Sequence, residues 1–190
     1  MRIGIAHHLG WAVVVTADDE HRVVDRRRIE LIEPGLPAAP VHHEGGTHDL
    51  HRTGPPLDDA ELAALVDEVT TSMRRATAAA LDVLVADLPG PVTALCVRDW
   101  PDGLPTDIAT LRRPPHEARV DSYRYCQVLA DDAEARGWTV HRYDARTVEA
   151  RAAEALGTRA DEVLHGPRAT LGPPWAKDHR QALAATIVAG

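Results

Sequence analysis

The sequence predicts an α/β fold with a mixed five-stranded sheet, and two observations predict it. The first is an opening of three short apolar stretches, at 2–6, 10–17 and 22–32, joined by tight connections. Short joints between consecutive strands indicate an antiparallel meander. The second is a later alternation of strands with helices, which indicates parallel crossovers. We therefore expect a three-strand antiparallel meander, then parallel strands, with helices on both faces.

The next segments are a long loop and a helix. Residues 33–56 are rich in Pro, Gly and His and show no usable periodicity, and a loop this long in a compact domain is often functional. From 60 to 81 apolar residues recur at helical spacing. These are Leu62, Leu65, Val66, Val69 and Met73.

A buried strand is predicted at Val83–Asp87, because the run is apolar and Pro89 and Gly90 stop it. This places Asp87 at the carboxyl end of that strand. The later elements are predicted from pattern and breakers in the same way. They are a short strand at 93–97, a proline-rich loop at 100–115, a helix at 117–136, a strand at 139–143, and helices at 145–156 and 178–189.

Composition limits the class of protein. With 190 residues and 44% hydrophobic content, the chain can bury one ample core, so we expect a single domain over 1–190. Two cysteines are too few for a disulfide framework or a cysteine zinc site, and indicate a cytoplasmic protein. No basic leader and no run of eighteen apolar residues occurs, so no membrane partner is expected. A net charge of -8 disfavours nucleic acid as a partner, unless a local basic face is assembled.

The element order and three short stretches resemble a known family. The stretches are Gly4-Ile5-Ala6 before Gly10-Trp11-Ala12-Val13, then Val83–Asp87, and finally Lys177-Asp178-His179-Arg180-Gln181-Ala182-Leu183-Ala184-Ala185. In these features the chain resembles the ribonuclease H-like superfamily, and most closely its RuvC-type Holliday-junction resolvase branch. The resemblance covers nearly the whole chain and implies a ribonuclease H-like sheet. By analogy with the resolvases, it also implies a homodimer.

The resemblance implies a particular site. In that superfamily, carboxylates on the first strand, the central fourth strand and the last helix bind two divalent cations, usually magnesium, which promote phosphodiester hydrolysis. Asp87 takes the place of the central acid and Asp178 that of the first acid on the last helix. Ala6 stands where the first acid is expected, however, and Gln181 replaces the last. Because two of four carboxylates are missing, a standard two-magnesium centre is not expected.

Histidines are the candidates to replace the missing acid. Alternation along the first strand puts Ala6 and His8 on one face and His7 on the other, so His8 is the preferred inward imidazole. The predicted metal ligands of this site are His7, His8, Asp87, Asp178 and His179. Mixed nitrogen and oxygen ligands suit zinc or manganese better than magnesium. The alternative is a degenerate site that binds no metal.

Two further clusters carry candidate residues. Four histidines and two acids fall within His42-His43-Glu44-Gly45-Gly46-Thr47-His48-Asp49-Leu50-His51, which could chelate a transition metal or could be an exposed loop that binds metal weakly. Near the carboxyl terminus, Arg168, Trp175, Lys177 and Arg180 supply cations and a flat ring for an anionic or nucleobase-bearing ligand. The alternative there is that Trp175 fills the core, with Lys177 and Arg180 solvated.

Two functions follow from these residues. One is a divergent metal-dependent phosphodiesterase or nuclease, with Asp87 and Asp178 as ligands, His8 replacing the lost acid, and Lys177 or Arg180 contacting phosphate. The other is a catalytically inactive ribonuclease H-like domain that binds a small molecule, a metal ion or a protein partner. The acidic net charge and the missing ligands favour the second.

Overall fold

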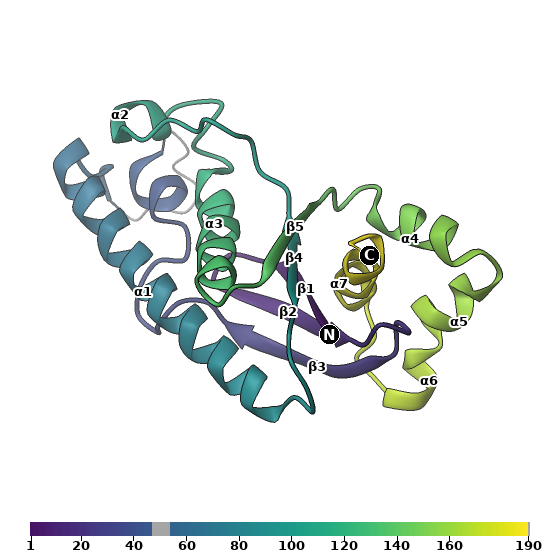
Figure 1. Ribbon diagram of the computed structural model, residues 1–190. Helices are drawn as coiled ribbons and strands as arrows, with labels where there is room; N and C mark the ends of the chain where they lie inside the picture. The colour runs from purple at the N-terminus through teal and green to yellow at the C-terminus, as the bar shows by residue number, and fades with distance from the viewer. Residues whose placement is uncertain (47–53, 190) are drawn as a thin grey trace.

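The computed structural model describes residues 1–46 and 54–189. A five-stranded sheet lies between helices (Figure 1). None of the helices in these two ranges is both long and apolar enough to cross a lipid bilayer. The elements are β1 (Arg2–His7), β2 (Trp11–Ala17), β3 (Val23–Glu30), the π-helix η1 (Val41–Gly45), α1 (Asp59–Asp87), β4 (Ala94–Arg98), α2 (Ile108–Leu111), α3 (Val120–Ala135), β5 (Thr139–Tyr143), α4 (Val148–Leu156), η2 (Gly157–Arg159), α5 (Ala160–His165), α6 (Pro167–Leu171) and α7 (Lys177–Val188).

The strands are arranged in the order β3-β2-β1-β4-β5. β2 pairs antiparallel with both β1 and β3, while β4 is parallel to β1 and β5 is parallel to β4. The prediction of an α/β fold, with an antiparallel meander followed by parallel strands, is therefore confirmed. The parallel pairing brings the carboxyl ends of β1, β4 and β5 to one edge of the sheet, which we call the carboxyl edge.

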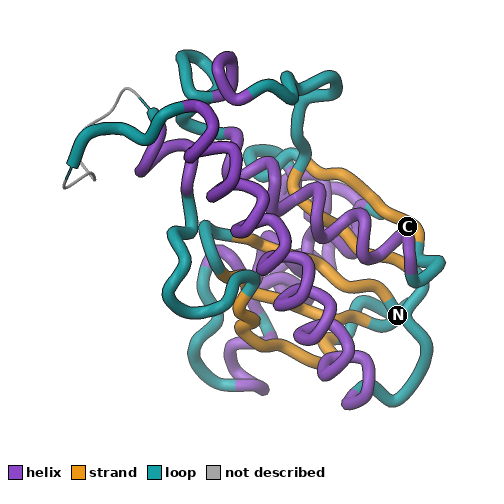
Figure 2. Tube along the Cα trace, turned by 90° about the vertical axis from the view of Figure 1, so that its left-hand side faces the viewer, coloured by secondary structure: helices purple, strands orange, loops and turns teal. Residues whose placement is uncertain are grey.

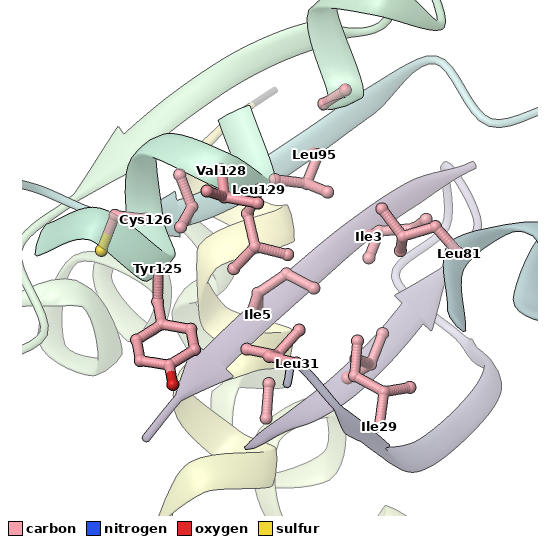
Figure 3. Close-up of a cluster of buried hydrophobic side chains, with 14 of the residues drawn as sticks. Ile3, Ile5, Ile29, Leu31, Leu81, Leu95, Tyr125, Cys126, Val128 and Leu129 are labelled. Atoms are coloured by element: carbon pink, nitrogen blue, oxygen red, sulfur yellow. The ribbon is translucent and has the colours of Figure 1, made fainter. Parts of the chain in front are cut away.

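Helices cover both faces of the sheet. Ile3 and Ile5 of β1 belong to a core cluster with residues of α1 and α3, including Leu81 and Leu129 (Figure 3). Figure 2 views this helical layer from the side on which α1 and α3 lie. Ala6 belongs to a second cluster on the other face, with α4, α5 and α7. Strand alternation thus sends neighbouring residues of β1 into two different cores.

The predicted strand at 83–87 is wrong, because α1 continues without a break to Asp87. Leu81 and Leu84 are buried and continue the helical stripe of apolar residues, while 60% of Val83 is exposed. A short apolar run is compatible with a buried strand or with a helix, and here it extends a long amphipathic helix. The strand that pairs with β1 after α1 is instead β4, at the short run where a further strand was expected.

The predicted loops contain short helical segments. η1 lies within the expected 33–56 loop, and α2 lies within the proline-rich loop that follows β4. α5 and α6 fill the stretch before α7. Segments of four to six residues are too short to show a helical period in the sequence, so the periodicity argument could not find them.

Candidate functional site

His7 ends β1 and is buried against α3. Its Nε2 lies 2.9 Å from the Ser122 hydroxyl and 3.6 Å from the Cys126 sulfur. Only 1% of His7 is exposed. Burial, with the charge of Arg98 as the next cause, lowers the His7 pKa from 6.5 to about 3. His7 is therefore neutral at physiological pH, and its ring fixes the position of the Ser122 hydroxyl.

His8 takes the opposite face of the strand, as alternation predicts. Its Nε2 lies 3.0 Å from Oδ2 of Asp178 in the first turn of α7. The His8 ring stacks on Trp11 with centroids 4.1 Å apart, and the Arg28 guanidinium lies 4.2 Å from the Trp11 ring centroid. The structure thus brings together two of the predicted site residues, His8 and Asp178, at the carboxyl edge.

Asp87 is not part of this arrangement. It ends α1, before the chain turns into β4, so it lies towards the amino end of that strand. Its Oδ2 accepts a hydrogen bond of 2.9 Å from Nη1 of Arg27. The placement of Asp87 at the end of the central strand is wrong, and the structure does not bring Asp87 to Asp178.

Arg98 is the residue that ends β4. Its Nε is buried and has no hydrogen-bond partner among the described residues. The neighbouring Asp99 is paired with Arg142, whose Nη2 lies 2.6 Å from Oδ1 of Asp99. Because Asp99 is paired elsewhere, the Arg98 guanidinium is suited to an anionic ligand. The signal in the sequence is the apolar run at 93–97 followed directly by Arg98, which was missed because the central strand was placed at 83–87.

Of the other candidates at the start of α7, Lys177 is exposed and His179 is used by the helix itself. Nδ1 of His179 accepts a hydrogen bond from the backbone N–H of Ala176 at 3.3 Å, which caps the helix. The His179 ring is buried, and this burial lowers its pKa. His179 therefore has a structural role next to Asp178, whereas Lys177 remains open to solvent.

The following turn of α7 is tied to the segment after β5. Nε of Arg180 donates to Glu149 in α4 at 3.1 Å. The Gln181 amide donates to the carbonyl of Ala145 at 2.8 Å. Both side chains therefore hold α7 against its neighbours.

The sequence predicts that the basic stretch before α7 binds an anionic ligand. In the structure this stretch does not reach the carboxyl edge. Trp175 is buried, and its indole N–H donates to the carbonyl of Leu164 at 2.8 Å, so the alternative of a core residue holds. Arg168 is exposed on α6, which packs beside the β2–β3 turn at the amino end of β1. The structure therefore does not bring Arg168 and Trp175 to His8 and Asp178.

The part of the histidine-rich cluster that is described forms η1. Both carboxylate oxygens of Asp121 accept backbone N–H groups from this segment, from His42 at 2.9 Å and from Val41 at 3.3 Å. Burial raises the Asp121 pKa from 3.8 to about 6. His42 and His43 lie with ring centroids 5.3 Å apart. The other predicted members of the cluster, His48, Asp49 and His51, lie outside the described residues.

Two adjoining cavities open at the carboxyl edge. The smaller has a volume of about 270 Å³ and is lined by His7, His8, His42 and Asp121, among others. The larger has a volume of about 630 Å³ and lies over the ends of β4 and β5. The two cavities share Arg98, Ala118 and Ser122 in their walls. Arg98 therefore reaches both spaces.

The larger cavity carries an excess of positive charge. Arg98, Arg119 and Arg146 line it. Two carboxylates are also in the wall, but Asp99 is paired with an arginine and Asp144 accepts the backbone N–H of Arg146 at 2.8 Å. Clefts lined by one sign of charge concentrate the opposite ion. This geometry favours an anion at the carboxyl edge.

The residues present do not fit a pair of divalent cations. Across residues 1–46 and 54–189, no group of three or more His, Cys, Asp and Glu side chains is placed to hold a metal ion. Such a centre needs several carboxylate oxygens, whereas at the carboxyl edge Asp178 contacts His8 and Asp99 is paired with Arg142. His42, His43 and Glu44 also form no such group within the described ranges.

Comparisons with known proteins give no family for this chain. A scan against protein-family models found no match, and neither did searches of curated proteins and of solved structures.

Proposed function

We propose that this chain is a ribonuclease H-like domain that binds a phosphate-bearing small molecule at the carboxyl edge of its sheet. The strand order 3-2-1-4-5, with β2 antiparallel to its neighbours, supports the ribonuclease H-like assignment. The observation that carries the ligand class is Arg98, a cation at the end of β4 that lines both cavities. An arginine at this position favours a phosphate over a metal ion.

The larger cavity is of a suitable size and composition for such a ligand. Small-molecule sites commonly have volumes of about 300–1,000 Å³, and this cavity lies in that range. Trp100 and Tyr123 supply aromatic surface beside the arginines. A phosphate near Arg98 would therefore leave room for an attached flat or polar group.

Binding tests the proposal directly. Isothermal titration with pyrophosphate and with adenosine monophosphate should show saturable binding that weakens as salt is added. Losing a charged hydrogen bond costs about 1.5–3 kcal/mol, so Arg98→Gln should weaken binding about tenfold or more. Arg168→Gln is the matched control, since Arg168 lies away from the cavity, and it should bind as the wild type does. Equal affinities for the two variants, or no saturable binding by the wild type, would overturn the proposal.

Phosphodiester hydrolysis is a second candidate function, favoured by the 3.0 Å contact between His8 and Asp178. A histidine oriented by a carboxylate can act as a general base. Branched and single-stranded nucleic acids should be assayed with Mg²⁺, Mn²⁺ and Zn²⁺, and with a chelator. If this candidate is correct, Asp178→Asn abolishes cleavage and Asp87→Asn, at the other end of the sheet, preserves it. Absence of cleavage in every condition leaves a binding domain without this activity.

The expectations about partners and location stay predictions. They are a homodimer, at most a local contact with nucleic acid, and a cytoplasmic location. Light scattering of the purified chain measures the oligomeric state. A duplex oligonucleotide added to the titrations measures nucleic-acid binding, which the net charge of -8 should make weak.

A further inference from the structure

A separate cavity lies on the other side of Trp100. It has a volume of about 590 Å³ and is bordered by α1, α3, β5 and the loop that follows β4. We call it the outer cavity. Trp100 lines both the outer cavity and the larger cavity at the carboxyl edge, so this indole is part of both walls.

The wall of the outer cavity contains Arg124, which forms no ion pair with another described residue. The Arg124 guanidinium donates one hydrogen bond of 3.1 Å to the Thr70 hydroxyl. Burial lowers its pKa below the usual value, and the nearby charge of Arg74 acts in the same direction. The carboxylates of Asp121 and Asp67 act on Arg124 only from a distance, and no ion pair to it occurs among the described residues. A buried charge without a close partner is costly and favours an anion nearby.

The rest of the wall mixes polar and apolar side chains. Leu104, Leu111, Val120, Val128 and Val140 line the cavity together with Trp100. Burial of hydrocarbon against such a wall contributes about 25 cal/mol per Å² of apolar surface removed from water. The cavity therefore offers a cationic group beside an apolar surface.

The other charged groups of the wall set the orientation of a ligand. Asp131 and Glu134 lie further along α3, about 10 Å and about 15 Å from Arg124 for a rise of 1.5 Å per residue. Arg142, near the carboxyl end of β5, also lines the cavity, but its charge is matched by Asp99 and Asp102. An anionic group is therefore favoured at Arg124 and away from the two acids of α3.

We propose that the outer cavity binds an organic monocarboxylate with an apolar tail, with its carboxylate on Arg124 and its tail against the Leu104 and Val128 side of the wall. A carboxylate matches the planar guanidinium and pairs with it through two parallel hydrogen bonds. This site is distinct from the carboxyl edge, and it does not depend on the proposed binding of phosphate there.

The test compares three probes of the full chain by isothermal titration, with tryptophan fluorescence as a second readout. Octanoate should bind and alter the fluorescence, because Trp100 lines the cavity. Octylamine has the same tail with the opposite charge, and acetate has the charge without the tail, so both should bind at least tenfold more weakly. Octylamine binding as tightly as octanoate would overturn the proposal.

Variants locate the site. Arg124→Gln should weaken octanoate binding at least tenfold, while Arg151→Gln, on the exposed surface of α4, should leave it unchanged. Arg98→Gln should also leave octanoate binding unchanged. If Arg98→Gln weakens octanoate binding, the carboxylate binds at the carboxyl edge and the proposal is refuted. Thr106→Trp, in the exposed part of the wall, should fill the cavity and abolish binding. That variant decides the matter if Arg124→Gln does not fold, since retained binding by Thr106→Trp would contradict the site.

Discussion

His7 and Asp121 are two buried titratable residues in the wall of the smaller cavity, and they shift in opposite directions. The His7 pKa falls from 6.5 to about 3 on folding, so its contribution to stability is present above pH 6.5 and is lost as the pH falls towards 3. The Asp121 pKa rises from 3.8 to about 6, so its contribution is present below pH 3.8 and is lost as the pH rises to 6. Between about pH 4 and 6 the two slopes oppose each other.

Single variants at these two positions should separate the slopes. With Asp121→Asn, the His7 contribution remains, so the free energy of unfolding should fall more steeply on acidification from pH 6 to 4 than in the wild type, by about 1 kcal/mol per pH unit. With His7→Gln, the Asp121 contribution remains, and the difference from the wild type should have the opposite sign. Urea denaturation at intervals between pH 4 and 7 measures both. If the free energy of unfolding of both variants changes with pH as that of the wild type does, His7 and Asp121 do not titrate in opposite directions.

At the scale of single residues, the sequence predicted which face of the first strand each histidine takes. It did not predict that Arg98 ends β4 at the carboxyl edge. Alternation alone placed His8 with Ala6 and turned His7 away, and the structure confirms this because β1 has no bulge. Arg98 was missed because the apolar run at 83–87, and not the run at 93–97, was predicted to be the strand that ends at the site. The burial of its Nε arises from tertiary packing and has no local signal.

At the scale of elements, α1 shows where pattern reasoning fails. Its start is strongly encoded, because Asp58 and Glu61 form a capping box around the first turn. Its end is not, because Val83-Leu84-Val85 has a β-branched and apolar composition that also suits a strand. The segment is helical because Leu81 and Leu84 extend the stripe of apolar α1 residues that packs on the sheet. The error mattered, because it moved a candidate ligand from one end of the sheet to the other.

A pair of neighbouring substitutions distinguishes a helix from a buried strand at this position. Leu84 is fully buried and 60% of Val83 is exposed, so Leu84→Ala should lower the free energy of unfolding by about 2–4 kcal/mol and Val83→Ala by less than about 0.5 kcal/mol. A strand buried on both faces would make both substitutions costly. Chemical denaturation of the two variants gives the comparison, and similar large losses would contradict the helical end of α1.

At the scale of the whole molecule, α7 reaches the carboxyl edge because it packs directly on β1. A methyl group added at Gly4 would lie 1.8 Å from the backbone carbonyl oxygen of Ala182, so only glycine allows this approach. The close packing of α7 positions Asp178 beside His8 at the end of the same strand. The opening glycine of the chain is therefore linked to the geometry of the site through one helix–sheet interface.

Gly4→Ala should therefore act on the fold and on the site together. The new methyl group meets backbone that cannot rotate away, so α7 must move from the sheet, and we expect a loss of about 3 kcal/mol in the free energy of unfolding. In the folded fraction, the His8–Asp178 contact should lengthen, which would appear as a changed chemical shift of the His8 ring by NMR. Gly54→Ala is the control, since a methyl group there meets nothing within 4 Å, and it should change neither quantity. A Gly4→Ala protein with wild-type stability and an unchanged His8 signal would show that α7 can adjust without disturbing the edge, and that the glycine is not what holds Asp178 in place.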